Sequence, residues 1–314
     1  MRGSLNYQVH QVFEKLNCIG QSKHEAKSLA RETGAKTWAA VGAKIGVYSY
    51  ATADVYRDTW RHVLEHAKAE YGVKDIERLT GQYVASYLET KIDQGVARAT
   101  FDQYAAACAK LEQALNRFAE QKGTGNVYGF DLKDVRSLGA KELGDRSGVS
   151  RAYAAPERLV AAVRGEQHAL AAALQREGGA RVKEVSFVGK DQLKGIWNDK
   201  LTGQARGWIE VQGKGGKERL VGVSPATYER LAVAITKAEH GRFDINGDRY
   251  REDLKQAAAS SRQNYEGSHG LRWSWAQNRH AELQERGMKY DQSLAQVSQE
   301  MGHERSDITE HYLK

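Results

Sequence analysis

The chain has 314 residues, of which 40% are hydrophobic, enough for two ordinary domains with a core each. No stretch approaches the roughly 20 apolar residues of a membrane-spanning helix, and the N-terminus lacks the apolar segment of a secretory signal, so we expect a cytoplasmic protein without a membrane partner. Two cysteines are too few for a disulfide framework or a thiolate zinc site. The 47 Lys and Arg against 40 Asp and Glu give a net charge of +7, which favours a polyanionic partner without establishing one.

The first 122 residues are predicted to be helical. From Thr100 onward, apolar side chains recur at the three-and-four spacing of one helix face. Thr100 and Gln103 have the pattern of a capping box, and Gly123 is placed to end this helix. No alternating strand pattern occurs in this half. We therefore predict a compact all-helical domain over residues 1–122, in which residues 1–45 are extra helices at the start.

The composition of the sequence changes after this domain. Residues 123–150 are rich in glycine and have no sustained apolar period, which indicates a linker. In residues 151–314, Pro156 and Pro225 each stand where a helix is expected to begin. Between those helices, "GWIEVQGKGGKERLVGV" has two alternating strands around a glycine turn, which predicts a hairpin. The expected fold class is mainly α with a small antiparallel β-sheet.

Two basic features of the second half carry candidate site residues. Arg181 follows a pair of glycines that end a helix, and Glu184 lies three residues further on, where it can hold the guanidinium. Taken alone, this pair also fits a surface ion pair of little energetic value. The hairpin turn carries Lys214, flanked by Lys217 and Arg219. Because no Ser or Thr follows the Gly-Lys, a nucleotide-phosphate loop is disfavoured, and the turn is either a solvated tip or a probe for a phosphate or a groove.

Further candidates lie near the end of the chain. His269 and Arg272 are three residues apart and share one face of a predicted helix. A His near an Arg is commonly structural, yet Arg suits forked contact with a phosphate and His can share a proton with it. His303 follows the glycine that ends the next helix, and Asp307 has the pattern of a cap for a last helix that carries Tyr312.

A metal centre is not expected in this half. The histidines at 269, 280, 303 and 311 form no His-Glu-x-x-His pair and no other short zinc spacing. No cysteine lies near them either. The sequence therefore predicts no metal and no other cofactor.

Four segments, taken in order, resemble the active-site motifs of the tyrosine recombinases, the family of lambda integrase, Xer and Cre. They are "GGARVKEV", "GKGGKERLVGV", "HGLR" and "MGHERSDITEHY". The likeness covers residues 151–314 well and residues 45–122 more loosely. It implies a two-domain tyrosine recombinase clamp, with an all-helical core-DNA-binding domain over 1–122 and an α+β catalytic domain over 151–314. The strand-rich arm-binding domain of lambda-type integrases has no counterpart in residues 1–45.

The resemblance also implies a role for each candidate residue. Six act on the reacting atoms: Tyr312 as the nucleophile, Arg181 and Arg272 as clamps on the scissile phosphate, His269 and His303 as proton-sharing groups, and Lys214 as the acid for the leaving 5′ oxygen. From their own positions in the sequence, Glu184 is expected to support Arg181, and Lys217 and Arg219 are expected to contact DNA.

The implied function is that of a site-specific DNA recombinase or integrase of a bacterial or phage mobile element. It would act as a tetramer on two duplexes with short inverted-repeat core sites, through a 3′-phosphotyrosyl intermediate and a Holliday junction, and accessory DNA-bending factors are a further candidate partner. A type IB topoisomerase-like strand transferase and a non-cleaving DNA-binding regulator are the alternatives. Only Leu313 and Lys314 follow Tyr312, whereas many relatives have a tail that docks on a neighbouring subunit. We therefore expect either that another surface couples the subunits or that the chain has been cut short.

Overall fold

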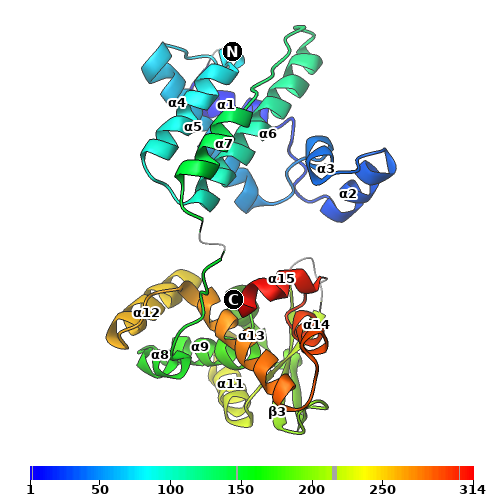
Figure 1. Ribbon diagram of the computed structural model, residues 1–314, viewed down its shortest axis with the longest axis vertical. Coiled ribbons are helices and arrows are strands. Elements are labelled where there is room, and N and C mark those ends of the chain that lie inside the picture. The colour runs from blue at the N-terminus through cyan, green and yellow to red at the C-terminus, as the bar shows by residue number, and fades with distance from the viewer. Residues whose placement is uncertain (2, 146–147, 214–217, 304) are drawn as a thin grey trace. The chain divides into compact units, whose positions relative to one another are not determined.

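The computed structural model of the chain describes residues 1, 3–145, 148–213, 218–303 and 305–314. The chain divides into two compact units, Met1–Arg146 and Ser147–Lys314, and most of their helices are labelled in Figure 1. Within the described residues, no helix is long and apolar enough to cross a membrane.

Helices build the first unit. In chain order they are α1 (Leu5–Phe13), α2 (Lys23–Glu32), α3 (Trp38–Lys44), α4 (Tyr50–Tyr71), the 3₁₀ turn η1 (Ile76–Arg78), α5 (Gly81–Asp93), α6 (Arg98–Lys122) and α7 (Lys133–Glu142). Its described residues contain no strand, only an isolated bridge between Asn17 and Val47. The expectation of an all-helical first part is confirmed.

The second unit combines helices with short strands. Its elements are α8 (Pro156–Ala162), α9 (Glu166–Gly178), α10 (Val182–Val185), β1 (Phe187–Gly189), η2 (Lys190–Gln192), β2 (Leu193–Asn198), β3 (Ala205–Gln212), β4 (Glu218–Val223), α11 (Pro225–Lys237), β5 (Arg242–Asp244), α12 (Gly247–Ser260), α13 (Gly267–Glu285), α14 (Tyr290–Glu300), α15 (Ser306–Glu310) and η3 (His311–Leu313). The predicted fold class, mainly α with small antiparallel sheets, is confirmed.

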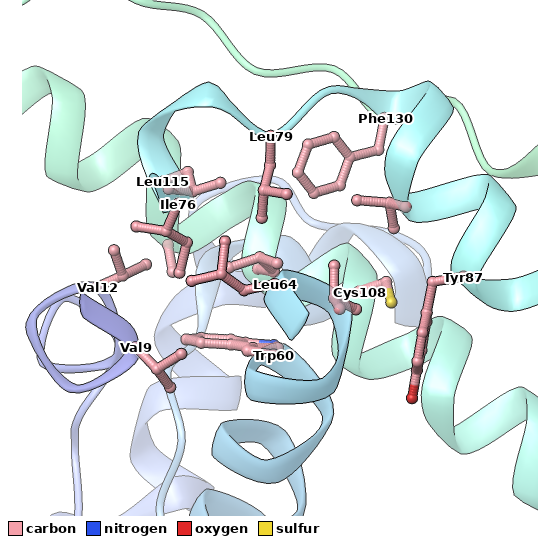
Figure 2. Packing of buried hydrophobic residues seen from close by; sticks show 14 of the residues in the cluster. Val9, Val12, Trp60, Leu64, Ile76, Leu79, Tyr87, Cys108, Leu115 and Phe130 are labelled. Atoms are coloured by element: carbon pink, nitrogen blue, oxygen red, sulfur yellow. The ribbon is translucent and has the colours of Figure 1, made fainter. Parts of the chain in front are cut away.

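The first unit packs around Trp60 of α4, which is fully buried. Its indole Nε1 donates to the carbonyl of Ala107 in α6 at 2.7 Å, so the one polar atom of the ring is satisfied inside an apolar core. Figure 2 shows Val9 and Val12 of α1 and Leu64 of α4 beside the same ring. This core fixes the helices of the unit relative to one another.

The linker predicted over residues 123–150 contains a helix instead. Residues Lys133–Glu142 form α7, whose Val135 is buried in the first core. Arg136 of the same helix donates through Nη2 to the carbonyl of Ala105 at 2.8 Å. The sequence does not predict α7, because few of its apolar side chains are buried and the glycines in and around it are typical of a flexible linker. The first unit therefore extends to Arg146, beyond the predicted boundary.

Two predicted helix starts are displaced by less than a turn. α6 begins at Arg98, so Thr100 lies inside its first turn, and α15 begins at Ser306, ahead of the predicted cap Asp307. The residues that do occupy these N-cap positions make no side-chain cap hydrogen bond. A capping side chain is thus a preference rather than a requirement, since water can satisfy the first N–H groups of a helix. Asp307 pairs with Arg305 instead.

The strands form two small antiparallel sheets. β2, β3 and β4 make a three-stranded sheet in that order, and β1 pairs with β5. The predicted hairpin corresponds to β3 and β4, in register from Gly207 opposite Val223. The sequence does not predict β2, because this strand is mostly exposed and its pairing shifts register at Gly195. Alternate residues of the central pair enter the second core: Ile209, Val211, Val221 and Val223.

Gly179 joins α9 closely to α13. It ends α9 with φ +63°, a conformation that side chains other than glycine rarely adopt. A Cβ at this position would lie 2.4 Å from Cδ2 of Trp275 in α13, so the close approach also requires glycine. The chain therefore leaves α9 against α13, and Arg181 follows two residues later beside the helix that carries His269 and Arg272.

Candidate active site

Separate segments of the second unit supply the predicted site residues that the structure describes: Arg181 as N-cap of α10, His269 and Arg272 in α13, His303 after α14, and Tyr312 in η3. Lys214 and Lys217 of the predicted site lie outside the described residues. The contacts below show that the described members lie together.

Glu184 is a buried carboxylate held between two arginines. Its side chain is 2% exposed, and its Oε1 accepts from Nη1 of Arg181 at 2.7 Å. Its Oε2 accepts from the backbone N–H of Arg181 at 2.7 Å and from Nη2 of Arg219 at 2.6 Å. Burial opposes ionisation, but the charge of Arg219 and the bonds from Arg181 outweigh it and lower the pKa of this carboxyl. An exposed ion pair, the alternative considered above, does not fit this geometry.

The prediction that Arg219 contacts DNA is wrong, because its guanidinium is held inside the protein. Its side chain is 9% exposed, and its guanidinium is turned into the protein. Nη2 holds Glu184, while Nη1 donates to the carbonyl of Glu300 at 2.8 Å. The correction follows from strand alternation, because successive side chains of β4 point to opposite faces. Arg219 thus supports the carboxylate that supports Arg181.

Arg272 is fully buried and has no carboxylate partner among the described residues. Its Nη1 donates to the carbonyl of Gly179, and its Nη2 to the carbonyl of Met301 at 2.6 Å, but its Nε has no partner among the described atoms. Burial and the charges of Arg181 and Arg219 lower the pKa of this guanidinium to about 9, so it remains charged at neutral pH. A buried cation with a spare donor favours a bound anion.

Arg181 lies next to Arg272, because both donate to the carbonyl oxygen of Met301. The distances are 3.5 Å from Nη2 of Arg181 and 2.6 Å from Nη2 of Arg272. The side chain of Arg181 is still 28% exposed. In the described part of the site, three guanidinium groups lie near a single carboxylate, that of Glu184, which pairs with Arg181 and Arg219 but not with Arg272. Neighbouring like charges repel unless an anion lies between them, so the site is suited to an oxyanion.

The Tyr312 hydroxyl lies beside this cationic group. Its oxygen is 2.8 Å from Nε2 of His269, and the residue is 9% exposed. The phenol ring packs against Trp273, with centroids 5.0 Å apart, and against His303, with centroids 5.6 Å apart. The ring is therefore held in place, and its hydroxyl faces a histidine that can exchange a proton with it.

His303 lies between Arg272 and α15. Its Nδ1 is 2.8 Å from Oγ1 of Thr309, and its Nε2 is 3.4 Å from Nη2 of Arg272. Because a guanidinium only donates, Nε2 of His303 is the acceptor and Nδ1 carries the proton that Thr309 accepts. The ring thus turns an acceptor nitrogen toward the cationic group.

Both site histidines are neutral in the free protein. Burial, followed by neighbouring arginine charges, lowers the pKa of His269 and of His303 to about 4. An unfolded chain binds protons at histidine near pH 6.5, so between pH 6.5 and 4 the unfolded state takes up roughly two protons that the folded state excludes. We expect stability to fall through this window as the pH is lowered.

Urea unfolding at pH 7.5 and pH 5 measures this effect. His269→Asn should retain a smaller dependence on pH than the wild-type protein, because one of the two excluded protons is gone. Equal stability of the wild type at the two pH values, or an unchanged dependence in the variant, would contradict neutral buried histidines.

Sequence reasoning missed Gln277, which anchors the chain end. Its Nε2 donates to the carbonyls of Tyr312 at 3.1 Å and of Lys314 at 2.9 Å. A signal was present, because His269, Trp273 and Gln277 follow at steps of four and so share one face of α13. No comparable signal links Thr309 to His303.

The arrangement can bind an oxyanion, hold a phenol next to it and take up the phenol proton. Within the described ranges of the chain, no group of three or more His, Cys, Asp or Glu side chains is placed to hold a metal ion. The described residues offer acid–base and nucleophilic chemistry, with electrostatic stabilisation by arginine.

No protein-family model and no curated protein sequence matches the chain. Among solved structures, it is similar to the XerH site-specific recombinase bound to palindromic difH substrate in a post-cleavage complex. That match has a TM-score of 0.62 and 14% identity, and covers 99% of this chain and 91% of that chain. The Tn1549 transposon integrase in complex with circular intermediate DNA matches with a TM-score of 0.54 and 12% identity, over 92% of this chain and 94% of that one. The chain thus has the two-domain fold of the tyrosine recombinases.

Proposed function

We propose that this protein is a site-specific DNA recombinase that cleaves and rejoins DNA through a covalent bond between Tyr312 and a 3′ phosphate. The observation that carries the proposal is the Tyr312 hydroxyl, 2.8 Å from His269 Nε2 and beside a buried surplus of arginine charge. The likeness in fold to XerH and the Tn1549 integrase, both solved with DNA, supports DNA as the substrate.

In the proposed reaction, Arg181 and Arg272 bind the scissile phosphate. Arg181 is partly exposed and can receive the phosphate from solvent, while Arg272 adds a buried positive charge with an unpaired Nε donor. Both offset the charge that develops on the phosphate oxygens, and one such donor is typically worth 10²- to 10³-fold in rate, roughly 3 to 4 kcal/mol. Glu184 acts as a positioning residue, because it fixes the guanidinium of Arg181 before the substrate arrives.

In the proposed cleavage step, one bond to phosphorus forms while another breaks. The Tyr312 oxygen forms a bond to phosphorus as the bond from phosphorus to the 5′ oxygen breaks. The phenol proton passes to Nε2 of His269, and the 5′ oxygen takes up a proton, for which we propose Lys214 as the donor. Attack by a 5′ hydroxyl of another strand reverses the step and releases Tyr312, so the ester keeps the bond energy and no cofactor is consumed.

In the proposed mechanism, phosphate binding makes His269 a stronger base. In the free protein, burial and the arginine charges keep the pKa of His269 at about 4, which makes it a weak proton acceptor. A bound phosphate offsets the charges of Arg272 and Arg181 and thereby raises this pKa. His269 thus becomes an effective base only with DNA in place.

The complete proposed reaction needs several chains. Four copies act on two duplexes with short inverted-repeat sites and pass through a Holliday junction, in the manner expected of an integrase of a mobile element. The helical first unit holds the core site, and the second unit carries the chemistry. Accessory DNA-bending factors are a further proposed partner.

A nicked-duplex capture experiment tests this function. Wild-type protein is mixed with a pool of duplexes that carry a nick beside random sequence, so that cleavage releases a short fragment and religation cannot occur. We expect protein–DNA adducts that resist denaturant and whose DNA converges on one sequence. A pool that binds the protein but yields no adduct would favour a non-cleaving regulator and contradict the proposal.

The captured sequence then separates recombinase from topoisomerase. A plasmid with two copies of the captured site should give deletion or inversion products, whereas a plasmid without the site should stay supercoiled. Relaxation of both plasmids without exchange between sites would assign the chemistry to a type IB topoisomerase-like enzyme instead.

A further inference from the structure

A cationic and aromatic surface lies on the hairpin of α2 and α3 in the first unit. Trp38, at the start of α3, is 64% exposed. The Nζ of Lys27 lies 5.4 Å and the guanidinium of Arg31 4.9 Å from the centroid of its ring. We call Lys27, Arg31 and Trp38 the α2–α3 patch. Figure 1 shows this hairpin, in blue, to the side of the other helices of its unit.

Charge is segregated around α2. Successive residues of a helix are turned by about 100°, so Lys27 and Arg31 share one side, and Glu25 and Glu32 fall on the opposite side. Among the described residues, no ion pair to Lys27 or Arg31 is found. The patch is therefore an uncompensated pair of cations on one turn of helix, kept apart from the acidic residues of the same helix.

The α2–α3 hairpin is held firmly by its own small core and by hydrogen bonds to α6. It has a small core of its own, formed by Ala30, Ala35 and Val41. Two side chains of α6 hydrogen-bond to the carbonyl groups at the end of α3. Lys110 donates through Nζ to the carbonyls of Gly42 and Ile45, each at 2.7 Å. Arg117 donates through Nη2 to the carbonyl of Lys44 at 3.0 Å. The patch is consequently fixed relative to the helical core of the first unit.

We propose that the α2–α3 patch binds the phosphate backbone of duplex DNA. This inference rests on the proposed function and adds a contact of the first unit to it. Lys27 and Arg31 each neutralise one phosphate, and Trp38 holds both side chains by cation–π contact, so less side-chain entropy is lost on binding. The bases of a duplex are stacked and offer Trp38 no platform, so the contact is independent of DNA sequence.

A second copy of the chain is a less suitable occupant. Each copy carries a net charge of +7, so a copy would have to present an acidic face to the patch against the overall repulsion. Duplex DNA presents a regular row of negative charge and meets this requirement without a specific partner surface.

The salt dependence of DNA binding tests the patch. The full chain is titrated with a mixed-sequence duplex at several salt concentrations, and log K is plotted against log salt. The double variant Lys27→Ala/Arg31→Ala should bind the duplex more weakly than the wild type. The slope of log K against log salt should become less steep by roughly 1.8, since each phosphate contact contributes about 0.9 to its magnitude. Alanine is a strong helix former, and circular dichroism checks that α2 is retained.

A charge-conserving variant is the matched control. Lys27→Arg/Arg31→Lys keeps both cations and should keep the wild-type slope. A slope in the alanine variant equal to that of the wild type overturns the inference, and so does a loss of self-association with an unchanged slope, which would assign the patch to a second copy. Adduct formation by the wild-type protein is scored separately, so a chain that binds without cleaving would refute the proposed function and leave this test intact.

Discussion

Replacing Tyr312 with Phe is expected to abolish covalent capture of DNA while DNA binding persists. The substitution removes the attacking oxygen, and loss of a nucleophile commonly lowers a reaction by at least about 10⁴-fold. The ring should stay in place, because Trp273 and His303 pack against it and neither contact involves the hydroxyl. Only the bond to His269 is lost, which costs about 1 kcal/mol in stability.

Tyr228→Phe is a matched control for this experiment. Its hydroxyl accepts a bond from the backbone N–H of Gly195 at 2.9 Å, and it links α11 to β2, neither of which carries a site residue. This variant also loses one hydroxyl and one hydrogen bond, yet it should form adduct at the wild-type rate. Both variants and the wild type are compared on the captured sequence in denaturing gels. Equal adduct from Tyr312→Phe and the wild type would remove Tyr312 from the reaction.

Replacing Glu184 with Gln is expected to cost about 3 kcal/mol of stability and most of the activity. The carboxylate is 2% exposed and neutralises Arg219 and Arg181 at once, so its removal leaves buried arginine charge without a counterion. The guanidinium of Arg181 also loses its fixed position, which should slow cleavage more than it weakens DNA binding. Thermal unfolding and single-turnover cleavage measure the two effects.

The effect of Glu184→Gln should depend on pH. The folded protein holds the pKa of Glu184 below its ordinary value of 4.5, so its stabilising contribution is present above that pH and is lost as the pH falls further. The difference in stability between wild type and variant should therefore shrink in acid. Glu157→Gln is the control, because Glu157 pairs with Arg176 at an exposed position and should cost less than about 1 kcal/mol. Equal losses from the two variants would contradict a buried supporting role for Glu184.

The positions of the candidate site residues are predictable from the sequence wherever a segment carries its own local marker. The glycine pair before Arg181, the three-residue step from His269 to Arg272, and the glycine before His303 each fix a backbone turn or a helix face within a few residues. Order along the chain then allowed the segments to be combined. The structure brings these described members together.

The remaining features depend on contacts across long separations in sequence. A basic residue after a glycine turn is expected to be exposed and to contact DNA, whereas the guanidinium of Arg219 meets Glu184 of another element. α7 and β2 bury few apolar side chains of their own, so their positions follow from neighbouring helices and strands rather than from a local period. Packing of this kind has no signal within a short window of sequence.

Identifying the covalent bond itself tests the proposed mechanism most directly. The adduct formed on the captured sequence is digested with protease, and the DNA-linked peptide is analysed by mass spectrometry, while the released strand is tested for its end group. We expect the DNA to be attached through its 3′ phosphate to Tyr312, with a free 5′ hydroxyl on the released fragment that a kinase labels without prior phosphatase treatment. Attachment through a 5′ phosphate, or to a residue other than Tyr312, would contradict the mechanism.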